Sequence, residues 1–152
     1  MKHEICKMMH KGALLHKRLM TSILERYNIT YAQYQVLKII DEHPGITAKE
    51  ILIYLDTDKA TLSGVLTRLE KSNLIERKID KEDRRLIHIY LTENSLSVCQ
   101  DVKSIESSCE AEMLKGLKPK EIRHFFEAFN QVINNQINKL ESQNQSIKDM
   151  LE

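Results

Sequence analysis

The sequence predicts a mainly α-helical fold that includes one small β-hairpin. The 152 residues contain only two Pro and four Gly, and so few chain breakers favour long helices over a fold with many turns. Apolar residues recur at helical spacing over most of the chain, except at 74–79 and 86–91, where apolar and polar residues alternate as in strands. With 41% hydrophobic and 30% charged residues, the composition is that of one globular domain.

Three helices are expected before residue 56. The first covers 3–26, where apolar residues recur on one helical face. A Thr and a Gln form a capping box at 30–33 that opens the second helix, and Pro44-Gly45 ends it. A Thr and a Glu form a second capping box at 47–50, which opens a short third helix.

A fourth helix follows 56–58, where Asp and Thr side chains can accept hydrogen bonds from a helix N-terminus. Its apolar stripe consists of Leu62, Val65, Leu66 and Leu69. A short capped helix followed closely by an amphipathic one is the helix-turn-helix pattern, whose second helix enters the DNA major groove with a short, polar, donor-bearing face. The face opposite the stripe has this character and comprises Lys59, Thr61, Ser63, Gly64, Thr67, Arg68 and Lys71.

The two alternating runs predict a hairpin whose polar loop spans 80–85. Arg84 and Arg85 lie at its tip, where arginines can reach a narrow minor groove beside the major groove. Asp83 is close enough in sequence to orient one guanidinium through a bidentate pair. The net charge of the chain is only +1, so any basic DNA-binding surface is local.

Two long helices end the chain, one capped by Thr92 and one with Pro119 in its first turn. They bear more apolar surface than a compact domain can cover. The side chains that a monomer would leave exposed are Phe125, Phe126, Phe129 and Ile133. Such a patch usually forms an interface, so a two-fold homodimer is expected.

The sequence resembles the MarR family of transcriptional regulators over almost its whole length. The resemblance lies in 28–34, 59–63, 69–71, 74–77, 80–86 and 91–92. It implies a winged helix-turn-helix DNA-binding part at 30–91 and a helical dimerisation part made of 1–29 and 92–145. The polar tail 146–152 is expected to fray.

The resemblance also implies double-stranded DNA with a pseudo-palindromic operator as the partner, and repression as the commoner mode of regulation. The recognition-helix contacts that it implies are Thr57, Lys59, Thr61, Ser63, Thr67 and Arg68. The predicted hairpin corresponds to the wing of the family. There the resemblance implies that Arg85, beside Arg84, enters the minor groove with support from Asp83. One departure from the family is Lys118, where many relatives cap the last helix with Ser or Thr.

The family suggests a phenolic or other aromatic acid as the effector, bound between the two parts of the chain. The candidate lining residues are Met9, Leu14, Tyr31, Tyr34 and His43. The alternative is that these side chains simply fill the core and the subunit interface.

A second candidate signal is an organic hydroperoxide or other oxidant, which one branch of the family senses through an N-terminal Cys. Cys6 stands at about that place, and lysines at positions 2, 7 and 11 favour its reactive thiolate. No Tyr lies close to it in sequence, so Tyr27, Tyr31 or Tyr34 would have to bond the thiolate across the fold. Cys99 and Cys109 lie in apolar stripes and are expected to be inert core residues.

A metal site and an enzyme are both disfavoured. His3, Cys6 and His10 share one helical face and are zinc-type ligands, but scattered polar residues at a frayed terminus explain them better, so no metal or cofactor is expected. No glycine-rich phosphate loop, nucleophile elbow or paired-His helix is present. Without a signal peptide or an apolar run of membrane length, the expected location is cytoplasmic. The alternative from another class is a winged-helix module that binds a protein instead of DNA.

Overall fold

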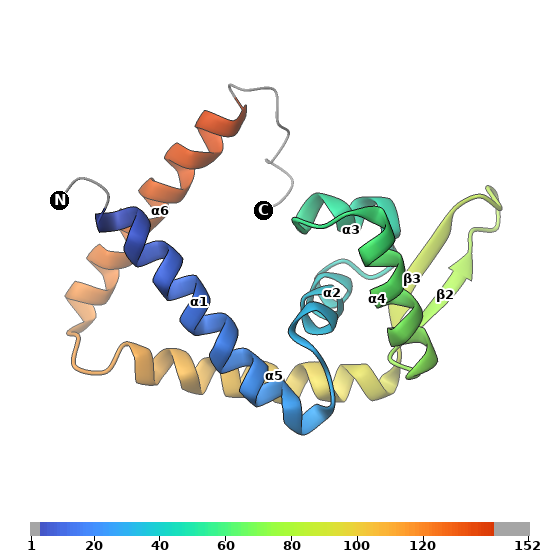
Figure 1. Cartoon of the computed structure of the whole chain (residues 1–152), viewed down its shortest axis with the longest axis horizontal. Helices are drawn as coiled ribbons and strands as arrows, with labels where there is room; N and C mark the ends of the chain where they lie inside the picture. Colours follow the sequence, from blue (N-terminus) through green and yellow to red (C-terminus); the bar gives the residue numbers. More distant parts are fainter. Residues whose placement is uncertain (1–3, 142–152) are drawn as a thin grey trace.

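A computed structural model describes residues 4–141, and Figure 1 shows its helices and small sheet. The elements in chain order are α1 (Glu4–Leu24), the 3-10 helix η1 (Glu25–Tyr27), α2 (Tyr31–Glu42), β1 (Ile46–Thr47), α3 (Ala48–Tyr54), α4 (Lys59–Lys71), β2 (Ile75–Ile79), β3 (Ile87–Leu91), α5 (Glu93–Met113) and α6 (Pro119–Glu141). The predicted mainly helical fold with a hairpin is therefore confirmed. The expected frayed tail at 146–152 lies outside the described residues.

Side-chain caps set the starts of the central helices, as predicted. The Thr30 backbone N–H donates to Gln33 Oε1 at 2.9 Å, and the Gln33 N–H donates to Thr30 Oγ1 at 3.2 Å. Thr47 and Glu50 form the same reciprocal pair at the start of α3. Because each pair satisfies amides that a helix N-terminus leaves free, it determines where the helix begins.

The N-terminal helix is shorter than the predicted 3–26. α1 ends at Leu24, and the chain tightens into the single 3-10 turn of η1. Asn28 then adopts a left-handed conformation with φ of 52°, and its N–H donates to the Glu25 carbonyl. Helical spacing of apolar residues continues past Leu24 but carries no information about this local turn, which redirects the chain into α2.

The sheet has three antiparallel strands in the order β1-β3-β2, so the predicted hairpin gains a strand that the sequence did not indicate. The hairpin register pairs Ile75 with Leu91, Arg77 with Ile89 and Ile79 with Ile87. The short β1 pairs with the middle of β3, next to the turn that ends α2. Two residues are too few to show an alternating pattern.

One hydrophobic core lies where α2, α3, α4 and the sheet meet. Leu37, Ile40, Ile51, Leu69 and Ile89 are fully buried there. α1 contributes its C-terminal end through Met20 and Leu24, and α5 contributes its N-terminal half through Cys99 and Val102. Together these contacts hold the two long helices against the compact body.

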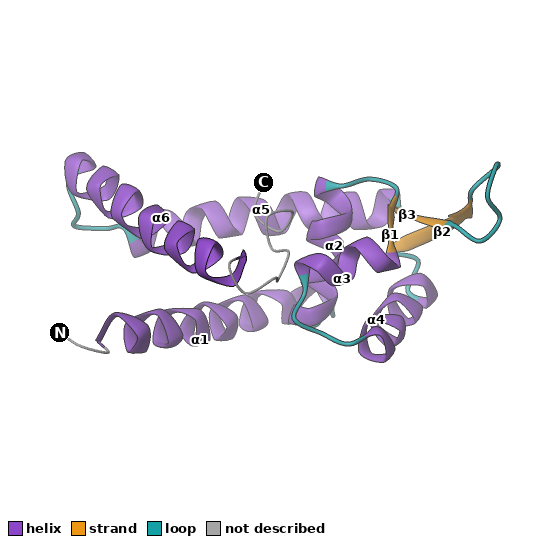
Figure 2. Cartoon of the chain, turned by 90° about the horizontal axis from the view of Figure 1, so that it is seen from above, coloured by secondary structure: helices purple, strands orange, loops and turns teal. Residues whose placement is uncertain are grey.

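Beyond this core, the long helices form an open frame at the other end of the protomer (Figures 1 and 2). None of the residues of α6 is buried. Leu96 and Met113 of the predicted α5 stripe are also exposed. Cys109 is only half-buried, so the expectation that it belongs to the core is wrong for the protomer. Among residues 4–141, no helix is long and apolar enough to cross a membrane.

Candidate nucleic-acid interface

α4 is firmly anchored at its N-terminus. The Asp58 side chain accepts the Thr61 backbone N–H at 2.8 Å and the Thr61 hydroxyl at 2.7 Å. These bonds, the side-chain one first, lower the pKa of Asp58, so the cap remains charged. The apolar stripe faces the core, because Leu62, Val65, Leu66 and Leu69 are all buried. The opposite face of α4 is thereby turned outward.

The outward face carries most of the residues implied for DNA contact. Lys59, Ser63 and Arg68 are exposed, whereas Thr57 is half-buried before the helix. The exposed Thr67 donates its hydroxyl to the Ser63 carbonyl at 2.9 Å. Because the Thr61 and Thr67 hydroxyls already donate within the protein, only their acceptor lone pairs and methyl groups are free for a ligand on this face. The donors expected of this face are therefore Lys59, Ser63 and Arg68.

Arg68 lies back along the helix over Gly64. An added Cβ at Gly64 would come within 3.7 and 3.8 Å of the two terminal guanidinium nitrogens. Because Gly64 has no side chain, the Arg68 guanidinium can lie close to the helix backbone on the outer face. An added Cβ would fit there at ordinary van der Waals distance, so only a side chain longer than that of Ala would have to displace the guanidinium.

The loop between β2 and β3 holds its arginine by hydrogen bonds. Arg85 Nε and Nη2 donate to the two carboxylate oxygens of Asp83, both at 3.0 Å, so the predicted bidentate pair is present. The side chain of Arg85 is 90% exposed even so. The pair lowers the pKa of Asp83 and raises that of Arg85, so both groups stay charged. Arg84 beside it is exposed.

Two further residues organise this loop, and the sequence reasoning missed both. Asp80 Oδ1 accepts the backbone N–H groups of Glu82 and Asp83, each at 2.8 Å. Its other oxygen, Oδ2, lies 3.0 Å from His88 Nε2. The second ring nitrogen of His88 lies 2.7 Å from the Gly45 carbonyl. No spacing rule could have found this pair, because Gly45 and His88 are 43 residues apart.

A separate cavity of about 250 Å³ lies where α1, α2, α3 and α5 approach one another. Its lining consists of His16, Tyr31, Tyr34, Gln35, Lys38, Ile39, Glu42, Tyr54, Leu55 and Glu106. Two of the five predicted effector residues, Tyr31 and Tyr34, are among them. Lys38 pairs across it with Glu106 at 3.8 Å. The spacing of 31, 35, 38 and 42 marks one face of α2, a signal that could have extended the prediction.

Tyr34 is the unusual group in this cavity. Its hydroxyl oxygen is buried and makes no hydrogen bond of good geometry among the described residues, although the Glu106 carboxylate lies close enough to act on it. Burial first, and then the negative charge of Glu106, raise its pKa, so the phenol is neutral at physiological pH. A buried hydroxyl without a partner has a free-energy cost that a polar ligand would relieve.

The other predicted effector residues lie elsewhere. His43 stacks on Tyr54 with ring centroids 5.0 Å apart and lines a different cavity, near β1 and α3. Leu14 is exposed and Met9 is half-buried on α1, and neither lines the cavity that contains Tyr34. The structure therefore brings together two of the five predicted residues.

The family model for MarR matches residues 29–87, which contain the interface just described. The chain is 32% identical over 101 residues to the HTH-type transcriptional regulator MgrA of Staphylococcus aureus, a match that covers 62% of this chain and 69% of MgrA. The chain belongs to the MarR family.

Two further comparisons of this MarR protein, with a second regulator and with a solved structure, are consistent with the family assignment. It is 33% identical over 94 residues to the organic hydroperoxide resistance transcriptional regulator of Bacillus subtilis, and the match covers 62% of this chain and 64% of that regulator. The chain thus spans less than two thirds of that relative. A structure of FabT from Streptococcus pneumoniae in complex with DNA has the same fold, with a TM-score of 0.81, 18% identity and coverage of 91% of this chain and 99% of FabT.

Cys6 of this MarR protein is exposed near the N-terminus of α1. Lys17 lies over the Tyr31 ring at 5.9 Å, which places Tyr31 beside the middle of α1. Lys17 is eleven residues, about 16 Å along the helix, from Cys6. Within one protomer, Tyr31 therefore does not reach the thiol. Of the suggested metal-ligand set, His3 lies outside the described residues, and 4–141 contain no cluster of three metal-type ligands.

Proposed function

We propose that this protein is a homodimeric repressor that binds a pseudo-palindromic double-stranded DNA operator through α4 and the β2–β3 wing. The observation that carries the proposal is the shared placement of α4 and the wing loop at one end of the protomer (Figure 2). The α4 helix exposes Lys59 and Arg68, and the wing loop exposes Arg85, which is ion-paired with Asp83. A polar helix with an adjacent arginine loop suits a major groove and the minor groove beside it.

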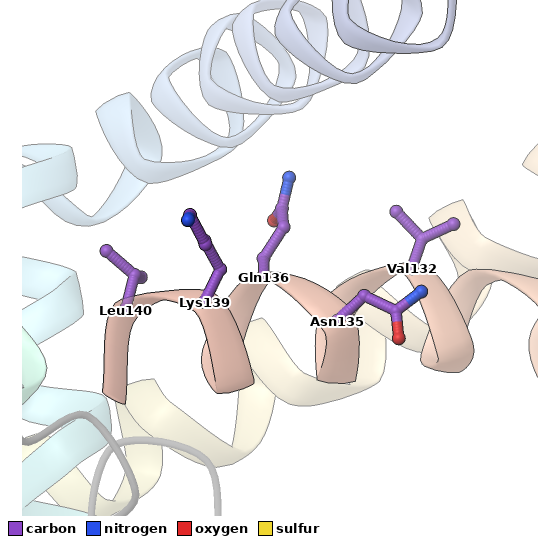
Figure 3. Close-up of a pocket in the computed structure, with 5 residues that line it drawn as sticks. All are labelled: Val132, Asn135, Gln136, Lys139 and Leu140. Atoms are coloured by element: carbon purple, nitrogen blue, oxygen red, sulfur yellow. The ribbon is translucent and has the colours of Figure 1, made fainter. Parts of the chain in front are cut away.

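The dimer is supported by the apolar face of α6. Phe125 and Phe129 stack at 5.7 Å while remaining 59% and 41% exposed. Further along α6, an open hollow is lined by Val132, Asn135, Gln136, Lys139 and Leu140, and Figure 3 shows Val132, Gln136 and Leu140 projecting to one side of the helix. A second copy covering these surfaces would give two α4 helices related by two-fold symmetry, as an inverted repeat requires.

The experiment that tests DNA binding uses a duplex selected by the protein from a random-sequence library. We expect an inverted repeat, and an affinity that falls steeply with salt because Lys and Arg displace counterions from phosphates. Failure to retain any duplex at low salt would refute the proposal and favour a protein-binding winged helix. The protein should repress a reporter gene placed downstream of the selected duplex, whereas activation of the reporter would contradict the proposal that the protein is a repressor.

For the signal, we propose an aromatic acid in the cavity that contains Tyr34. The phenolic rings of Tyr31 and Tyr34 offer apolar contact, and Lys38 and His16 offer partners for a carboxylate. The cavity lies between α1 and α5 on one side and α2 and α3 on the other, so a ligand there would change how the long helices sit against the body that carries α4. The Tyr34 hydroxyl, which makes no hydrogen bond of good geometry in the protein, would gain one from the ligand.

Cys6 is kept as a second candidate, because it is exposed and because one relative is a regulator of organic hydroperoxide resistance. One release assay separates the two signals. Hydroxybenzoic acids and an organic hydroperoxide are added to duplex complexes of wild type, Tyr34→Phe and Cys6→Ser. Loss of acid response only in Tyr34→Phe supports the cavity, and loss of peroxide response only in Cys6→Ser supports the thiol. Equal release from all three proteins by both compounds contradicts both signals.

A further inference from the structure

His88 occupies an unusual position between two hydrogen-bond acceptors. Its Nδ1 lies 2.7 Å from the Gly45 carbonyl, and its Nε2 lies 3.0 Å from Asp80 Oδ2. A carbonyl and a carboxylate can only accept, so each ring nitrogen must donate to satisfy both contacts. A neutral imidazole has one N–H and only the imidazolium has two. The geometry therefore calls for the protonated ring.

This ring links the body of the protein to the wing loop. Gly45 stands in the turn before β1 and adopts a φ of 85°, and a Cβ added there would come within 2.9 Å of the Tyr90 hydroxyl. The Gly45 N–H donates to the Ile89 carbonyl at 3.0 Å, and this bond holds the acceptor on the body side in place. On the wing side, Asp80 uses its other oxygen to hold the N–H groups of Glu82 and Asp83. The Asp83 carboxylate in turn accepts two hydrogen bonds from the Arg85 guanidinium.

We propose that protonated His88 is a positioning residue that holds the wing loop in its DNA-binding geometry, so that operator affinity falls when His88 loses its proton. The inference rests on the proposed function, because it assigns a role to the wing arginine on DNA. Gly45, His88, Asp80, Asp83 and Arg85 form one continuous chain of hydrogen bonds. If the ring loses one proton, either the Gly45 carbonyl or Asp80 Oδ2 loses the hydrogen bond that His88 donates to it.

The charged groups around His88 favour this state. Asp80 belongs to the wing loop, and Glu50 of α3 also acts on the ring. Lys49 and His43 share its cavity. From β2, Lys78 is the register partner of His88, but its ammonium pairs with Glu76 at 2.6 Å and lies over the Tyr90 ring. The positive charge on that side is thus partly neutralised.

The direction of the pKa shift agrees with the geometry. The hydrogen bond to the Gly45 carbonyl first, and then that to Asp80, raise the pKa of His88 above its ordinary 6.5. Stabilisation from this bridge is therefore fully present below 6.5 and is lost as the pH rises through the raised value.

The first test is an NMR titration of the histidine ring protons of the free protein, with His88 assigned from its absence in His88→Gln. We expect His88 to titrate above 6.5 in the wild type and at a lower pH in Asp80→Asn. A wild-type value at or below 6.5, or no change in Asp80→Asn, would overturn the bridge. This readout needs no DNA, so it decides the bridge even if no operator is found.

The second test measures affinity for the selected duplex between about pH 6 and pH 8.5 at constant ionic strength. Wild-type affinity should fall about threefold to tenfold over this range, within the limit of one linked proton. His88→Gln should bind more weakly at low pH with a flatter profile. His88→Arg, whose guanidinium donates from more than one nitrogen at every pH, should retain affinity throughout.

His43→Gln is the matched control, since it removes a histidine of the same cavity whose ring stacks on Tyr54, and it should keep the wild-type profile. An unchanged pH profile in His88→Gln overturns the inference while leaving the proposed function intact. If the wild type binds no duplex at any pH, the proposed function fails instead.

Discussion

At the scale of single residues, the ion pair between Asp83 and Arg85 sets the orientation of an exposed charged side chain. Arg85 is almost fully exposed, yet Asp83 fixes the plane of its guanidinium with two hydrogen bonds. An exposed ion pair contributes little to folding stability. The pair instead presents the arginine in one orientation, which reduces the entropy that it would lose on entering a groove.

We therefore expect Arg85→Ala to weaken operator binding by roughly fivefold to a hundredfold while leaving the oligomeric state and thermal unfolding unchanged. Titration of the selected duplex measures the affinity, and sedimentation reports the oligomeric state. Lys81→Ala, which removes another exposed charge from the same loop, should cost much less affinity. Equal losses in the two variants would mean that the loop acts only through its total charge.

At the scale of elements, the helices begin at reciprocal caps that the sequence reveals directly. The Glu50 carboxylate accepts both the backbone N–H and the hydroxyl of Thr47, at 2.8 and 2.7 Å. These bonds, the hydroxyl one first, lower the pKa of Glu50 below its ordinary value of 4.5. Because its folded pKa is lowered, Glu50 stabilises the fold above pH 4.5, and the contribution disappears as the pH falls through the folded value.

Thr47→Ala should lower the free energy of unfolding by about 1 kcal/mol at neutral pH. The difference between wild type and variant should shrink as the pH falls through the lowered folded pKa of Glu50, because the protonated carboxyl group no longer caps the helix as an anion. Chemical denaturation at fixed protein concentration measures both values. Thr21→Ala, an exposed threonine within α1, is the matched control and should cost less. A pH-independent difference would show that Glu50 takes no part in the cap.

The start of α6 illustrates how an element can form by a route other than the one expected. Lys118 stands at the position before Pro119, and its side chain cannot accept a hydrogen bond from the helix N-terminus. The Lys118 backbone N–H instead donates to Glu121 Oε2 at 2.7 Å. Half of a capping box is therefore present, with Pro119 in the first turn.

At the scale of the whole molecule, the protomer has a closed end and an open end. Ion pairs from α2 to α5, Asp41 with Lys103 and Lys38 with Glu106, tie the compact body to the long helix. At the open end, no residue of α6 is buried, and its three phenylalanines, Phe125, Phe126 and Phe129, are exposed. A second subunit is the simplest cover for these side chains.

Phe129→Glu should shift the protein towards the monomer and weaken operator binding in parallel, because a charge in an apolar interface is not solvated. Sedimentation over a range of protein concentrations measures the first effect, and duplex titration the second. Asn134→Glu adds the same charge on the opposite side of α6 and should change neither. A Phe129→Glu protein that dimerises like wild type would exclude this face from the interface.

The sequence by itself determined the order of the helices, the caps at Thr30, Thr47 and Asp58, the hairpin and the Asp83–Arg85 pair, because each depends on residues a few positions apart. Tertiary structure alone decided what lies next to what over longer distances. It paired β1 with β3, gathered His16, Tyr34 and Glu106 around one cavity, left Cys109 half-buried and placed His88 against Gly45. These outcomes depend on how the packed elements turn relative to one another, and periodicity along the chain carries no information about that.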